Sequence, residues 1–121
     1  MERFVITRNI DGMFQFSYKD RQGRTIFYSG SYTRKTMCVK GICSVKYNSQ
    51  DSVKFNKKKS PNGNMFYFNI KSSNGKVIAI SELFEEKEMR DSYIASIKSG
   101  VLNAIIEEDK KVKSMARELS W

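Results

Sequence analysis

The 121-residue sequence contains no histidine, a single proline and only two cysteines. Without histidine the chain cannot build a Ser-His or Cys-His nucleophile pair, and most zinc sites are excluded as well. No segment approaches the roughly 18 apolar residues of a membrane-spanning helix. Arg8 and Asn9 interrupt the N-terminal apolar run before a signal-peptide core could develop. We therefore expect a soluble, cytoplasmic protein that does not associate with membranes.

The two cysteines, Cys38 and Cys43, lie five residues apart in one expected helix. Their side chains would point about 140° from each other, so that neither a disulfide nor a shared metal ion forms easily. Isolated helical cysteines are usually small buried apolar residues, which is the interpretation we favour for both, with a redox or metal role left open. Nothing in this pattern requires an oxidising compartment. We expect no metal and no cofactor.

Recognisable catalytic patterns are also missing. No phosphate-binding or dinucleotide-binding glycine pattern occurs. Four glycines stand instead at expected hairpin turns, where a positive φ is needed: Gly12, Gly23, Gly63 and Gly75. Carboxylates gather near the start of one expected helix, where the helix dipole favours acids without any catalytic role: Glu82, Glu85, Glu86 and Glu88. The sequence therefore indicates a protein that is not an enzyme.

A stretch at residues 41–48, GICSVKYN, has an echo at residues 93–100, YIASIKSG. Other features recur at the same offset of 52 residues: the alternating apolar pattern of 14–18 returns at 66–70, and the Gly23 hairpin returns at Gly75. This regularity predicts a duplicated unit. Because a unit of about fifty residues buries too little apolar surface to be robust alone, the two repeats, about 3–52 and 53–106, are expected to share one domain spanning residues 1–109.

Each repeat begins with expected strands and continues into a helix. Strands are predicted at residues 3–9, 14–18 and 25–29, and again at 53–59, 66–70 and 77–81, from their alternation and the turn signals between them. Thr33 is the expected cap of the first helix, and Gly41 is expected to allow a close approach between that helix and the sheet. The second helix is predicted over 85–99, with Gly100 as its terminator.

Two C-terminal segments follow. The apolar residues 101–106 fit either further helix or a closing strand, and the β-branched pair Ile105 and Ile106 favours the strand. Residues 110–121 form a highly charged tail in which apolar residues keep helical spacing, so we predict a short amphipathic helix.

The order of these motifs resembles the YegP-like family of small bacterial proteins, whose activity is unassigned. The resemblance is carried by 41–46 and 94–98, by the glycine hairpins, and by Ser29 and Ser81 at the strand ends. It implies an α+β fold with two tandem β-β-β-α-β repeats, which form one continuous antiparallel sheet by exchanging terminal strands and carry the helices on one face. Tyr93 departs from the family glycine, Glu85 and Glu86 replace serines, and the tail is an addition.

The formal net charge is +9, and all of the excess lies in residues 1–60, which hold 13 Lys and Arg against 4 Asp and Glu. Nucleic acid is therefore one candidate partner, with aromatic side chains such as Phe27, Tyr67 and Tyr47 available for stacking if one face of the sheet is uncovered. The candidate contacts are the cations of the first repeat: Arg21, Arg24, Arg34, Lys35, Lys40, Lys46, Lys57, Lys58 and Lys59.

The function that we favour from sequence is a small non-catalytic interaction or structural module, which binds a protein partner or a second copy of itself. Sheet edges are natural contact sites for such a module. In the tail, Leu119 and Trp121 are candidate anchors, because aromatic and large apolar side chains dominate many interfaces. Nucleic-acid binding through the basic first repeat is the alternative.

Overall fold

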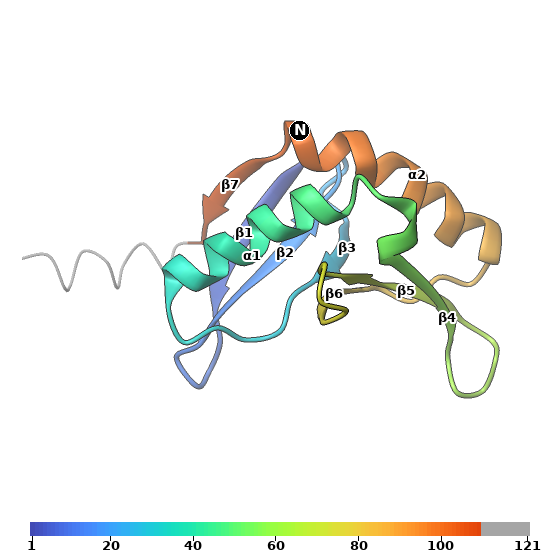
Figure 1. Cartoon of the computed structure of the whole chain (residues 1–121), viewed down its shortest axis with the longest axis horizontal. Coiled ribbons are helices and arrows are strands. Elements are labelled where there is room, and N and C mark those ends of the chain that lie inside the picture. The colour runs from blue at the N-terminus through green and yellow to red at the C-terminus, as the bar shows by residue number, and fades with distance from the viewer. Residues whose placement is uncertain (110–121) are drawn as a thin grey trace, which may run out of the picture.

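The computed structural model describes residues 1–109, so the predicted tail helix at 110–121, with Leu119 and Trp121, lies outside the described residues (Figure 1). The first repeat contains β1 (Arg3–Arg8), β2 (Phe14–Lys19), β3 (Thr25–Tyr28) and α1 (Lys35–Asn48). A short 3₁₀ turn, η1 (Ser52–Lys54), leads into the second repeat, with β4 (Phe55–Lys59), β5 (Phe66–Lys71), β6 (Val77–Ser81), α2 (Lys87–Asn103) and β7 (Ile105–Glu108). The predicted closing strand is thus confirmed.

The seven strands form one sheet in the order β4-β5-β6-β3-β2-β1-β7. Neighbouring strands are antiparallel except for β7, which runs parallel to β1 with Arg3 opposite Ile105. The prediction of a wholly antiparallel sheet was therefore wrong. A short hairpin forces antiparallel pairing, whereas β7 reaches β1 only after the 17-residue helix α2, and a helical crossover permits a parallel strand.

An approximate two-fold axis relates the repeats, and it passes through the pairing of β3 with β6. There Tyr28 lies opposite Ile80, its own equivalent at the 52-residue offset. Ser29 and Ser81 make equivalent hydrogen bonds. The Ser29 hydroxyl accepts from the Phe16 amide, and the Ser81 hydroxyl accepts from the Phe68 amide. These side chains satisfy a backbone donor at the corresponding position in each half, which explains why serine recurs at this strand end.

Both helices lie on the same face of the sheet (Figure 1). Between them and the strands is one apolar cluster drawn from both repeats, whose fully buried members include Phe4, Phe16, Phe27, Ile42, Phe68 and Ile97. Gly41 lies at the closest approach, because a Cβ there would be 3.1 Å from Phe16 Cε2 and would overlap the Tyr32 hydroxyl. The expected packing role of Gly41 is confirmed.

The helix ends differ from the prediction. Arg34, not Thr33, is the N-cap of α1, and no side chain caps that end. Helix α2 continues through Gly100 to Asn103. Gly100 does not terminate the helix; it lies against the hydroxyl of Tyr18, where a side chain would overlap. Tertiary packing therefore overrides the local stop signal.

Arg90 connects α2 to the edge strand β4, although its side chain is almost fully buried. Its Nε donates to Asp91 Oδ1 at 3.0 Å, and a terminal guanidinium nitrogen donates to the Lys58 carbonyl at 3.2 Å. Lys57 Nζ lies 3.3 Å from the same Asp91 oxygen. Desolvation alone would raise the pKa of Asp91, but the hydrogen bonds from Arg90 and Lys57 outweigh it and hold the pKa below its usual range.

The Gly41→Ala variant is expected to lower the free energy of unfolding by about 1 kcal/mol or more, because overpacking outweighs the gain in helix propensity. The measurement is urea denaturation, and the control is the same substitution in a Tyr32→Phe background. Removing the hydroxyl that the new Cβ overlaps should reduce the cost. An equal cost in both backgrounds would contradict the proposed contact.

The Asp91→Asn variant tests the ion cluster on α2. Because the pKa of folded Asp91 is lowered, its ionised form stabilises the protein above the unfolded pKa of about 3.9, and this contribution is lost as the pH falls through the folded pKa. The side chain is 37% exposed, so we expect a difference of no more than about 1 kcal/mol at pH 7. Denaturation at pH 7 and pH 2 should show this difference vanish in acid. Glu85→Gln is the control, and a pH-independent difference would exclude the interpretation.

Candidate interaction surfaces

The nine candidate cations of the first repeat do not converge on one surface. Arg21 and Arg24 belong to the β2–β3 hairpin, Lys35, Lys40 and Lys46 to α1 with Arg34 as its N-cap, and Lys57, Lys58 and Lys59 to β4. The strands β4 and β7 are opposite edges of the sheet, and Lys35 pairs with Glu108 of β7. Lys35 and the cations of β4 therefore lie at opposite edges of the sheet, while Lys40 lies beside the β5–β6 hairpin.

Several of these cations already have partners. Arg21 forms an ion pair with Glu2 at 3.2 Å, and Lys57 forms one with Asp91. Arg24 donates to the Tyr93 hydroxyl at 3.0 Å. Lys46 donates to the Ala104 carbonyl, with its ammonium 5.8 Å from the centre of the Phe4 ring. Within residues 1–109, Arg34, Lys40 and Lys59 are exposed and make no ion pair, but they lie on different elements.

The face of the sheet opposite the helices carries a continuous row of cross-strand neighbours. Residues paired across strands share a face, and the register runs through six strands from β1 to β4: Val5, Ser17, Tyr28, Ile80, Asn69 and Asn56. We call this row and its same-face neighbours the open face. At its centre Tyr28 and Ile80 are 41% and 39% exposed.

Asn69 is the one described residue with a buried side-chain polar atom that lacks a hydrogen-bond partner, its Oδ1. It lies in the row of the open face, opposite Ile80 on β6 and Asn56 on β4. Buried polar atoms are nearly always hydrogen-bonded in folded proteins. Asn69 Oδ1 is therefore the one polar group of the row for which the described residues offer no donor.

The alternation of the strands splits the remaining candidates between the two faces. Lys58 pairs with Tyr67 on the open face, whereas Lys57 and Lys59 have the opposite parity and Lys57 reaches Asp91 of α2. Phe27, expected as a stacking side chain, is fully buried in the core. Tyr47 is 76% exposed but belongs to α1, on the helical side. Only Tyr67 among the three predicted aromatics lies on the open face.

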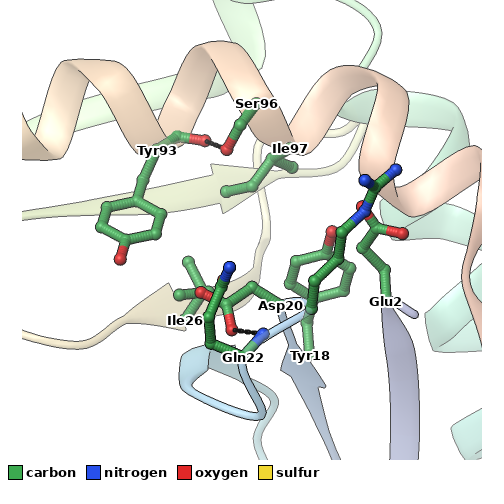
Figure 2. A pocket seen from close by; sticks show the side chains of 9 residues that line it. Glu2, Tyr18, Asp20, Gln22, Ile26, Tyr93, Ser96 and Ile97 are labelled. Carbon is green, nitrogen blue, oxygen red and sulfur yellow. Dashed lines mark hydrogen bonds and ion pairs between the residues drawn. The ribbon is translucent and has the colours of Figure 1, made fainter.

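A cavity of about 240 Å³ lies between α2 and the β2–β3 hairpin (Figure 2). Tyr93, Ser96 and Ile97 reach it from the helix, and Asp20 and Gln22 from the hairpin. Sequence reasoning missed this site. The period of two in β2 identifies Tyr18 as a core residue, but no sequence signal shows that α2 crosses this particular hairpin.

The cavity is bordered by negative charge and a protonated phenol. Glu2 and Asp20 line it beside Tyr18. Burial, followed by the carboxylates of Glu2 and Asp20, raises the pKa of Tyr18 to about 12, and the opposing effect of Arg21 is smaller. The hydroxyl therefore remains protonated at neutral pH and can both donate and accept a hydrogen bond.

The two cysteines have different surroundings. Cys38 is fully buried, and burial raises the pKa of its thiol to about 11, as suits an inert core residue. Cys43 is exposed, so the prediction that it is buried was wrong; it lies on the outer side of α1. In residues 1–109, no group of three or more metal-ligating side chains comes together, and no helix has the length and apolar character needed to cross a membrane.

Comparison with known protein families assigns both repeats. The model of a family described as a domain of unknown function, DUF1508, matches twice, at residues 10–54 and 62–108. These two segments correspond to the duplication predicted at an offset of 52 residues, so the tandem organisation is confirmed.

Similar proteins share most of their length with this chain. The UPF0339 protein YegP of Escherichia coli K12 is 35% identical over 106 residues, which cover 88% of this chain and 96% of YegP. A UPF0339 protein encoded 5′ of the ptx operon in Stutzerimonas stutzeri is 32% identical over 105 residues, 87% of this chain and 94% of that protein.

Two solved structures have the same fold. The solution structure of yegP from E. coli, a protein of unknown function, gives a TM-score of 0.82 at 34% identity and covers 89% of this chain and 92% of its own. The solution structure of the UPF0339 protein SO3888 from Shewanella oneidensis gives 0.82 at 27% identity, covering 88% and 90%. With two matched repeats, relatives above 30% identity and a shared α+β fold, this chain belongs to the DUF1508 family, the family of YegP.

Proposed function

We propose that the protein is a non-catalytic interaction module that binds a protein partner on the open face of its sheet. The observation that carries the proposal is the half-exposed apolar pair Tyr28 and Ile80 at the centre of the row, next to Asn69, whose side-chain Oδ1 has no hydrogen-bond partner among the described residues. A partner that supplies apolar surface to Tyr28 and Ile80 would remove both side chains from water.

The size and chemistry of the open face support a protein partner. Seven strands at about 4.8 Å spacing span roughly 30 Å, the width of a patch that buries about 800 Å² on each side of a standard interface. The apolar centre is flanked on the same face by Lys19 and Lys58. Because interfaces combine an apolar centre with a polar rim, we expect a partner with an apolar centre and an acidic margin.

The two repeats, about 3–52 and 53–106, would act as one binding unit within residues 1–109. The pairing of β7, at the end of the second repeat, with β1 of the first supports an exchange of a terminal strand between the repeats. Leu119 and Trp121 are proposed as additional anchors for the same partner, on their residue types alone.

A photo-crosslinking amino acid at position 28 tests the open face in the native host. We expect a crosslinked product at position 28 and none at position 47, although Tyr47, on the helical side, is the more exposed tyrosine. Mass spectrometry then separates a second copy of the chain from another protein. Adding Ile80→Glu should lower the yield at position 28 by at least tenfold, because it places a charge at an apolar centre. Equal yields at positions 28 and 47 would reject the open face.

Nucleic-acid binding is the second candidate, and it is favoured by the adjacency of Tyr67 and Lys58 on the open face. Reversing Lys57, Lys58 and Lys59 to Glu should then weaken binding to a random single-stranded oligonucleotide and flatten its salt dependence, by about 0.7 in log–log slope for each lost contact. Fluorescence anisotropy at several salt concentrations measures both effects. The matched control reverses Lys76, Lys87 and Lys98 of the second repeat. Equal losses in the two variants, or no binding below about 100 µM at low salt, would reject this candidate.

A further inference from the structure

The two-fold relation between the repeats creates two equivalent clefts, each between a helix and the hairpin of the other repeat. One cleft lies between α1 and the β5–β6 hairpin and is lined by Ser44, Asn48, Ser73 and Asn74. Its equivalent is the cavity of Figure 2, between α2 and the β2–β3 hairpin. Because the two clefts occupy equivalent positions in the repeats, residues that differ between them indicate where their binding properties differ.

In the first cleft a hydrogen-bonded asparagine, Asn48, forms part of the lining. The Asn48 amide donates to the Ser44 carbonyl at 2.8 Å, and the Ser73 hydroxyl donates to Asn48 Oδ1 at 3.4 Å. At the 52-residue offset, glycine replaces this asparagine in the second cleft, at Gly100. The space is occupied by the Tyr18 hydroxyl, which lies so near that a Cβ on Gly100 would overlap it.

The Tyr18 hydroxyl has no hydrogen-bond partner among residues 1–109, although its residue is only 3% exposed. The hydroxyl itself is not a fully buried atom, because it borders the cavity, and the hydroxyl of a tyrosine with a buried ring normally finds a partner. Figure 2 shows this hydroxyl directed toward α2, beside Glu2, with Ile97 pointing into the same space from the helix. An unpartnered phenol at the border of a cavity indicates a missing ligand atom.

The charges around the cavity indicate which kind of ligand atom would fit beside the Tyr18 hydroxyl. Glu2 is only 16% exposed at its side chain, and its one ion-pair partner among the described residues, Arg21, is 73% exposed. A second carboxylate, Asp20, lines the same cavity. The raised pKa of Tyr18 is consistent with this negative charge: burial is its main cause, and the carboxylates of Glu2 and Asp20 raise it as well. Arg21 lines the cavity as well, so that two carboxylates face one guanidinium and the lining keeps an excess of negative charge, which favours a cationic donor over an anion.

We propose that this cavity binds a small primary ammonium compound with a short aliphatic body. The ammonium donates to the Glu2 carboxylate and to the Tyr18 hydroxyl oxygen, and it takes the place of Arg21 on Glu2. The aliphatic body rests on Ile26 and Ile97, which are each 1% exposed. A volume of about 240 Å³ admits roughly eight non-hydrogen atoms if each takes the space of one water molecule.

The proposal is tested by titrating the full chain with n-butylammonium, its neutral isostere 1-butanol and the anion butyrate, followed by amide chemical shifts in NMR. We expect saturable shifts for n-butylammonium, with a Kd of the order of 1 mM. They should appear at residues 20–22 and 96–100, with weaker shifts for butanol and none for butyrate. Equal binding of butyrate, or shifts centred on the first cleft at 44–48 and 73–74, would overturn the proposal.

Three variants assign the contacts. Glu2→Gln and Tyr18→Phe should each weaken n-butylammonium binding by about tenfold, as expected for a lost charge-assisted hydrogen bond, and Gly100→Ala should abolish it by displacing the Tyr18 hydroxyl that its Cβ would overlap. The control is Glu82→Gln, which removes an exposed carboxylate outside the cavity and should leave binding unchanged. Should Gly100→Ala fail to fold, Glu2→Gln still decides the question, because Glu2 pairs only with an exposed arginine side chain. Equal losses in Glu2→Gln and Glu82→Gln would reject the site.

Discussion

The pairing of β3 with β6 is the contact on which the rest of this structure depends. Two residue pairs, Phe27 with Ser81 and Tyr28 with Ile80, join two three-stranded units into a single sheet. Neither unit of about fifty residues buries enough apolar surface alone, and this contact lets both helices cover one shared cluster. It also places Tyr28 and Ile80 together at the centre of the opposite face, where the proposed partner binds.

The two repeats agree where a side chain supports the backbone, and they differ where the helices pack against the sheet. Ser29 and Ser81 make the same hydrogen bond in each half. In contrast, Gly41 accommodates the Tyr32 ring, whereas its equivalent Tyr93 stacks on Phe84, the equivalent of Tyr32, at 5.1 Å. The paired change keeps α2 docked, and it brings the Tyr93 hydroxyl to Arg24 beside the cavity. Differences between equivalent positions are therefore better guides to function here than the shared motif.

Local patterns predicted most elements because they depend on short-range physics. The alternation in 14–18 and 66–70 identified β2 and β5, and the hairpin glycines have the positive φ that their turn positions required. Predictions failed where a distant residue decided the outcome. The sequence predicts Gly100 as a helix terminator, but in the structure Gly100 makes room for the Tyr18 hydroxyl. Likewise, the sequence predicts Cys43 as a core residue, but its side chain is exposed. The parallel direction of β7 likewise depends on where α2 crosses the sheet.

By itself, the sequence determined that this protein is a tandem α+β repeat without histidine chemistry, because composition and periodicity are properties of the chain alone. It also indicated the concentration of positive charge in the first sixty residues. Only the tertiary structure decided that this charge is dispersed among the hairpin, α1 and β4, that Asn69 lacks a donor on the open face, and that Tyr18 borders a cavity under α2. Each of these depends on contacts between residues remote in sequence, which no local pattern encodes.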